Sequence, residues 1–164
     1  MKRATLIALA ALSFGAAAQE SDQKVRIVDS VGAWEVSVVQ SSSCMATLKF
    51  PPPGGDHLFI PDVMNGGVIL EILNEGLHIP DATYKVGVKM EGYSGQSRAD
   101  GEGHIVAIRL NAKESALFRR ASWVSLTLGD HEHKFTNLAE NGRAIDSLIA
   151  CNAKIKDPFA ISPK

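Results

Sequence analysis

Residues 84–91 of the chain read Tyr-Lys-Val-Gly-Val-Lys-Met-Glu, an alternation of apolar side chains with polar or small ones. Successive side chains of a β-strand point to opposite faces, so this pattern predicts a strand with one face on a core and the other in water. The same alternation recurs at residues 34–38, 44–50, 106–110 and 124–128. Antiparallel sheets tolerate strands with one solvent-exposed face, whereas all-parallel sheets usually do not. The sequence therefore predicts a mostly β protein built on an antiparallel sheet.

Turn sequences separate these predicted strands. Three prolines and two glycines fill residues 51–55, and they cannot continue a strand because proline lacks the N–H that a sheet ladder needs. Other turn sequences lie at residues 65–67, 92–95, 100–103 and 129–130. The glycines at 101 and 103 are interpreted as a hairpin signal before a strand that starts at His104.

Two segments have helical features. Asn111 is followed three residues later by Glu114, which resembles a capping box and predicts a short helix over residues 115–120. From Asn141 to about Ala153, apolar residues recur at helical spacing. We therefore expect an antiparallel β-sandwich or partly open barrel, with a C-terminal helix and a short helix before the last hairpin. It would form one domain over residues 19–164, with irregular ends at 19–24 and 156–164.

The first residues have the order of a secretion signal. Lys2 and Arg3 precede an apolar run from Ala4 to Gly15, and Ala16 and Ala18 supply the small side chains that signal peptidase needs before its cut. The run is shorter than the roughly 20 residues of a membrane-spanning helix. We expect residues 1–18 to be a cleaved signal peptide, which places the mature protein in the bacterial periplasm or outside the cell, with no later membrane segment.

Composition narrows the class of partner. Without Lys2 and Arg3 the chain has 15 basic and 18 acidic residues, and the basic ones are scattered. Nothing in this balance favours electrostatic capture of nucleic acid or anionic lipid. The expected partner is therefore an unknown protein or small ligand at the cell envelope.

Two cysteines are present, Cys44 and Cys151. Cys44 falls in the apolar phase of its predicted strand, and Cys151 shares an apolar helix face with Ala144 and Leu148. An exported protein meets oxidising conditions, so we expect these cysteines to form a disulfide between the sheet and the helix. Their long separation would give a stabilisation of about 4–5 kcal/mol in the loop-entropy treatment.

Known catalytic motifs are not completed in this sequence. Gly92-Tyr93-Ser94 begins like a nucleophile elbow, but residue 96 is Gln, and the context is a hairpin turn. Gly101-Glu102-Gly103 lacks the third glycine of a phosphate-binding loop, and no helix follows it. We expect no catalytic residue, no cofactor and no metal ligand.

Two features are weighed as possible binding sites. His131 and His133 are two apart, so both imidazoles would lie on one side of a strand, where a third ligand from elsewhere could complete a metal site. The favoured interpretation is a solvated hairpin tip after Gly129-Asp130. Trp123 is out of phase with the apolar residues after it, so it is a candidate binding surface, or it packs under a loop or the short helix.

The chain resembles the invasion-associated locus B family of proteobacterial exported proteins. Residues 32–36 read Gly-Ala-Trp-Glu-Val, similar to that family's opening Gly-x-Trp-x-Val strand, which in the family is soon followed by a cysteine. The resemblance continues at Leu117 and at residues 123–126, 135–138, 144–145 and 148–151, in the order of the family's C-terminal half. It implies a periplasmic or surface β-sandwich whose molecular activity is poorly defined.

A second resemblance gives an alternative function. Residues 33–36, followed by 44–48, are similar to the opening of periplasmic metalloprotease inhibitors, small disulfide-bearing β-barrels whose N-terminal segment enters the protease cleft. The leading hypothesis is a non-enzymatic envelope protein that binds a partner or ligand through its sheet surface or loops. The alternatives are a periplasmic protease inhibitor and an enzyme whose site is assembled only in the fold.

Overall fold

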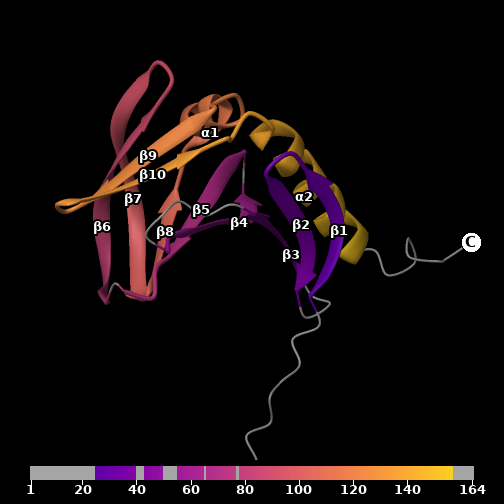
Figure 1. Cartoon of the computed structure of the whole chain (residues 1–164), viewed down its shortest axis with the longest axis horizontal. Coiled ribbons are helices and arrows are strands. Elements are labelled where there is room, and N and C mark those ends of the chain that lie inside the picture. Colours follow the sequence, from indigo (N-terminus) through magenta and orange to yellow (C-terminus); the bar gives the residue numbers. More distant parts are fainter. Residues whose placement is uncertain (1–24, 40–42, 50–54, 65, 77, 157–164) are drawn as a thin grey trace, which may run out of the picture.

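The computed structural model describes residues 25–39, 43–49, 55–64, 66–76 and 78–156. Within these ranges the chain forms ten antiparallel strands in one open sheet and two α-helices (Figure 1). The strands in chain order are β1 (Arg26–Val31), β2 (Trp34–Val39), β3 (Ser43–Leu48), β4 (His57–Met64), β5 (Gly67–Leu73), β6 (Ile79–Met90), β7 (Tyr93–Gly103), β8 (Ile105–Arg109), β9 (Trp123–Leu128) and β10 (His131–Thr136). The helices are α1 (Ala112–Phe118) and α2 (Asn141–Lys156). The expected signal peptide, the expected irregular start at 19–24 and all but the first residue of the expected irregular end at 156–164 lie outside the described residues; Lys156 is the last residue of α2.

The sheet has the order β1-β2-β3-β4-β5-β8-β7-β6-β9-β10. It arches, so that β1–β3 and β6 lie on opposite limbs of the curve (Figure 1). The seven strands from β4 to β10 form the barrel-like part, whereas α2 packs on β1–β4. The predicted class, a partly open antiparallel barrel or sandwich with a C-terminal helix and a short helix before the last hairpin, is confirmed.

The alternating apolar residues form the core. The largest side chains with no significant exposure include Trp34, Phe118, Phe135, Ile108 and Leu126. The indole Nε1 of Trp34 donates a hydrogen bond of 2.8 Å to Oδ1 of the buried Asn141, whose amide nitrogen donates to the carbonyl of Phe118 at 2.9 Å. One buried asparagine therefore connects β2, the end of α1 and the start of α2.

Helix α1 begins with the predicted capping box. The Asn111 side chain accepts from the Glu114 N–H at 3.0 Å, and the Glu114 carboxylate accepts from the Asn111 N–H at 2.9 Å. The helix covers residues 112–118 instead of 115–120. Helix α2 continues to Lys156, three residues beyond the predicted end.

Two predicted turns are misplaced. The turn expected at residues 92–95 lies at 91–92, because β7 begins at Tyr93. The segment 100–103 is not a turn, because β7 continues through it and the chain reverses only at Gly103 and His104. Gly103 has a φ of 61°, which suits glycine. Gly101 has a different role. A Cβ placed there would lie 2.6 Å from Cγ2 of Ile79 and 2.8 Å from the ring of Tyr84, so this glycine allows the start of β6 to pack closely on β7.

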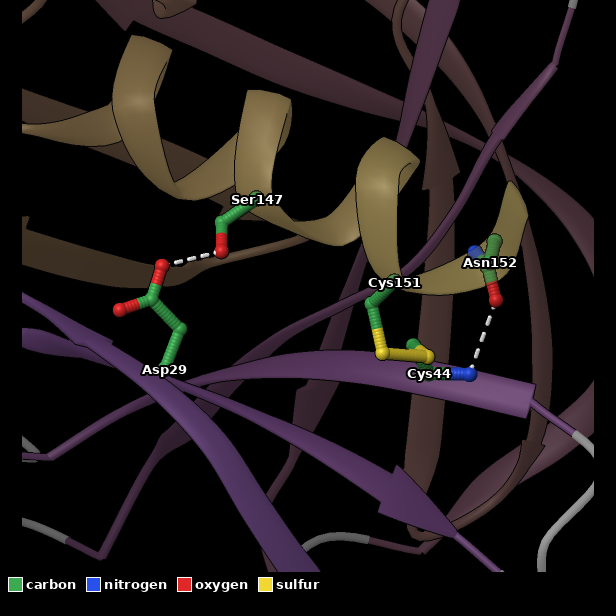
Figure 2. The surroundings of a disulfide bond; sticks show 5 residues. All are labelled: Asp29, Cys44, Ser147, Cys151 and Asn152. Carbon is green, nitrogen blue, oxygen red and sulfur yellow. Dashed lines mark hydrogen bonds between the residues drawn. A yellow bond between two sulfur atoms is a disulfide. The ribbon is translucent and has the colours of Figure 1, made fainter. Parts of the chain in front are cut away.

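Cys44 on β3 and Cys151 on α2 form the expected disulfide, with 6.0 Å between their Cα atoms (Figure 2). Two hydrogen bonds accompany it. The backbone N–H of Cys44 donates to Oδ1 of Asn152 at 2.9 Å, and the Ser147 hydroxyl donates to the carboxylate of Asp29 on β1 (Figure 2). The last two turns of α2 are thus joined to β1 and β3 by one covalent and two polar links. Among the described residues, neither helix has the length and apolar character needed to cross a membrane.

Candidate functional site

A buried polar pair crosses the open seam of the barrel. Nδ1 of His133 on β10 lies 2.8 Å from Oδ2 of Asp56, which immediately precedes β4. The two side chains are only 8% and 12% exposed. Strands β10 and β4 are at different positions in the sheet order and share no ladder, so this contact is made by side chains alone. It links the last strand of the sheet to the beginning of β4.

The carboxylate of Asp56 is itself held in place. Its Oδ1 accepts a hydrogen bond of 2.5 Å from the amide nitrogen of Asn74, which immediately follows β5. Asp56 and Asn74 are neighbours because β4 and β5 pair antiparallel, with His57 opposite Leu73. A carboxylate only accepts hydrogen bonds, so the pairing places the proton of a neutral His133 on Nδ1 and leaves Nε2 for another partner.

His133 lies at the wall between two spaces. On the barrel side is a small apolar cavity with room for about one water molecule, lined by residues such as Ile72, Val106 and Leu126. On the other side is an open cleft of about 300 Å³, formed by the start of β6 and the β9–β10 turn. The polar side chains of this cleft are those of His78, Tyr84, His131 and His133, and its apolar walls include Ile79, Pro80 and Leu128.

Two contacts organise the cleft. The Tyr84 hydroxyl donates to the carbonyl oxygen of Pro80 at 2.8 Å, which fixes the ring against the start of β6. The imidazole of His78 meets that of His104 edge to face, with 6.2 Å between ring centroids. His131 is exposed at the rim, whereas His133 is buried at the back. The cleft therefore combines one fixed imidazole with two at its opening.

The interpretation of His131 and His133 as a solvated hairpin tip holds for His131, which is exposed next to the turn, but is wrong for His133. Both histidines line the cleft and share a side, as the spacing predicts. His133, however, is a core residue in phase with the buried Phe135, and the carboxylate of Asp56 compensates for its burial. Within the described part of the chain, no three His, Cys, Asp or Glu side chains are arranged to hold a metal ion.

The chemistry that this arrangement offers is hydrogen bonding at Nε2 of His133. Among the described residues that line the cleft there is no serine, threonine or cysteine. Ser94, the residue of the incomplete elbow motif, lies instead on β7, opposite Lys89 of β6, and is exposed. The cleft thus has a histidine held by a carboxylate, as in catalytic relays, but its described lining offers no serine, threonine or cysteine for that histidine to activate.

Trp123, the other candidate surface, lies half-buried on β9. The ammonium group of Lys134 on β10 sits 5.6 Å from the centre of its ring, within the range of a cation–π contact. One face of the indole is therefore covered by a neighbouring side chain. Trp123 belongs to a different part of the surface from the residues that line the cleft.

Glu71 is another carboxylate, besides Asp56, that the fold partly buries. It lies at the centre of β5, opposite Phe59 on β4 and Ala107 on β8, on the side of the sheet that does not face the core. Burial raises the pKa of this carboxyl above its usual range. Nothing among the described residues brings it near the cleft.

Asp56, Asn74 and Tyr84 are site residues that the sequence did not reveal. Asp56 follows the Pro-Gly segment and looks like an ordinary turn residue, and its histidine partner is 77 positions away. One available signal was the phase of β10, because His133 alternates with Glu132 and Lys134 and shares a face with Phe135. A histidine in an apolar phase requires a buried polar partner.

No protein-family model matches this chain, and no curated protein and no solved structure is significantly similar to it. The function is therefore inferred from the residues of this protein and their geometry.

Proposed function

We propose that this protein is an exported bacterial envelope protein that binds a small ligand in the histidine-lined cleft and does not transform it chemically. The observation that carries this proposal is the buried His133–Asp56 pair at the back of the cleft. Export is supported by the leader-like order of residues 1–18 and by the disulfide between Cys44 and Cys151. Periplasmic and extracellular locations both suit this proposal.

The pair is costly as a purely structural device. Two polar side chains leave water to form it, and well-packed apolar residues of similar volume are often equally stabilising at such a position. Apart from Asn74, the residues that line the cavity beside His133 are aliphatic, so an apolar side chain would suit that environment. The carboxylate does, however, fix the ring orientation and the tautomer of His133. A fixed Nε2 at the back of a cleft is what a binding site needs to orient a ligand.

The lining indicates the kind of ligand. The walls at Ile79, Pro80 and Leu128 favour an apolar body, and the imidazoles can donate or accept a hydrogen bond. No lysine or arginine is among the described lining residues, so no strong electrostatic capture of a multiply charged anion is built in. A cleft of about 300 Å³ is at the small end of ligand sites. The ligand is therefore a small, largely apolar molecule with one hydrogen-bonding group, such as an alcohol or a monocarboxylate.

A fragment screen by ligand-observed NMR on the mature, disulfide-bonded protein tests this proposal. The library contains aromatic and aliphatic alcohols and monocarboxylates. We expect hits that are lost or weakened in His131→Ala, which removes an exposed imidazole from the cleft rim. The matched control is His57→Ala, which removes a half-buried imidazole stacked on Phe59, away from the cleft. A library without hits, or hits that His131→Ala and His57→Ala weaken equally, would count against binding in this cleft.

A further inference from the structure

The two edges of the sheet, β1 and β10, differ in chemistry. Natural edge strands are usually protected by charged side chains, because an unpaired edge can add a strand from another molecule. β10 follows this rule, with Glu132 and Lys134 exposed along it. β1 also carries two exposed charged residues, Arg26 and Asp29, and a bulge, but it exposes aliphatic side chains between and beside them. Val25, Ile27 and Val28 are 55%, 56% and 43% exposed, and they make up half of the large apolar side chains that are exposed in the described residues.

The free side of β1 has no partner strand within the described part of the chain. β1 pairs with β2 along one side only, and it stands at the end of the sheet order. Helix α2 packs beside it, and the Ser147–Asp29 hydrogen bond holds the strand to that helix. The strand is thus presented as a fixed edge on which exposed aliphatic and charged side chains are mixed.

A bulge in β1 gives the edge an unusual charge pattern. Ile27 pairs with Ser37 and Asp29 pairs with Val36, so Val28 is an extra residue on the β1 side. Arg26 lies opposite Val38, and Asp29 lies opposite Val36, and both of these partners point into the core. The bulge therefore places Arg26 and Asp29 on the same face, although residues three apart in a regular strand lie on opposite faces.

We propose that β1 pairs antiparallel with β1 of a second copy of this chain, so that the two sheets join into one across a twofold axis between Ile27 and Val28. In this register Arg26 of each copy lies opposite Asp29 of the other. Cross-strand neighbours must share a face, and the bulge provides that match. The same register places Ile27 opposite Val28 of the second copy, which brings the exposed aliphatic side chains together and removes them from water.

The charges at this edge persist at neutral pH. The hydroxyl of Ser147 and the backbone N–H of Ser30 lower the pKa of Asp29, so its carboxylate stays ionised. Each Arg–Asp contact would be exposed and individually weak. The twofold axis makes every contact occur twice. The charge pattern fixes the register, whereas the apolar side chains and main-chain hydrogen bonds supply most of the affinity.

Sedimentation velocity on the mature, disulfide-bonded protein over a wide concentration range tests the proposal. The wild type should dimerise reversibly. Arg26→Glu should weaken the dimer by about tenfold or more, since it replaces two attractions by two repulsions. Asp29→Lys should do the same. An equimolar mixture of the two variants should restore the dimer as a heterodimer, because every cross-strand pair is then of opposite charge.

Apolar variants provide the matched control. Ile27→Lys should abolish the dimer, whereas Ile149→Lys, at another exposed apolar position, on α2, should leave it unchanged. All these positions are exposed, so thermal unfolding should show that each variant remains folded. A wild type that is monomeric throughout overturns the proposal. So does a dimer that is insensitive to Arg26→Glu and Ile27→Lys, or a variant mixture that remains monomeric.

Discussion

Removing one partner of the His133–Asp56 pair should destabilise the protein more than removing both. In His133→Leu the carboxylate of Asp56 stays at its 12% exposed position without the imidazole, and breaking a buried pair in this way costs about 3–5 kcal/mol. Asp56 keeps the amide of Asn74 as a donor, so the expected loss is at the lower end, about 3 kcal/mol. Asp56→Leu leaves two donors, Nδ1 of His133 and the amide of Asn74, without an acceptor, at a cost of about 2–3 kcal/mol.

In the double variant Asp56→Leu/His133→Leu only the amide of Asn74 loses its partner. The two leucines can pack against the aliphatic side chains that line the neighbouring cavity. We therefore expect the double variant to be within about 1–2 kcal/mol of the wild type. The coupling energy between the two positions would then be about 3–5 kcal/mol, at or above the upper end of what directly contacting residues show.

Equilibrium urea unfolding at neutral pH, with the disulfide intact, measures these differences. His57→Leu is the control for loss of an imidazole at a half-buried site on the sheet, and it should cost less than about 1 kcal/mol. The reasoning is refuted if the cost of the double variant equals the sum of the two single costs. It is equally refuted if His133→Leu is no more destabilising than His57→Leu.

Three further predictions concern the rest of the chain. Cys151→Ser should lower the free energy of unfolding by about 2–5 kcal/mol, and reductant should lower the melting temperature of the wild type but not of the variant. Burial raises the pKa of Glu71 above the usual 4.5, so its ionised form disfavours folding at neutral pH. Glu71→Gln should therefore melt higher than the wild type at pH 7, and the difference should vanish as the pH falls below that usual value; an increase that persists in acid would contradict the assignment. N-terminal sequencing of exported protein should begin at Gln19 or within a residue or two, whereas full-length protein retained in the cytoplasm would contradict the proposed export.

Local patterns were sufficient for about half of the sheet. A strand such as β6, with one solvent-exposed and one buried face, shows its period in the sequence, and Asn111 with Glu114 marks the start of α1 directly. β1, β4, β5 and β7 were not predicted, and the first two have clear physical reasons. β1 is exposed on both faces over most of its length, so burial imposes no period on it. In β4 the bulge between Phe59 and Asp62 shifts the alternation, and Pro61 reads as a strand breaker.

The candidate site was less predictable than the fold. Its central contact joins Asp56 to His133 across the barrel seam, and such a contact depends on how far the sheet curls. Curling is a property of many strands together, and no short window of sequence encodes it. Gly101 is a similar case, because only the close packing of Ile79 and Tyr84 distinguishes it from a turn glycine.

The central claim is that Asp56 holds His133 ready to bind a small ligand in the cleft. Side-chain ¹H–¹⁵N NMR of the histidines, with and without a bound fragment from the alcohol and monocarboxylate library, tests it most directly. In the free protein the neutral form of His133 should carry its proton on Nδ1, and a binding fragment should shift the Nε2 resonance of His133 together with the signals of His131. A free protein in which neutral His133 carries its proton on Nε2, or a fragment that binds while both Nε2 resonances stay in place, would contradict the claim.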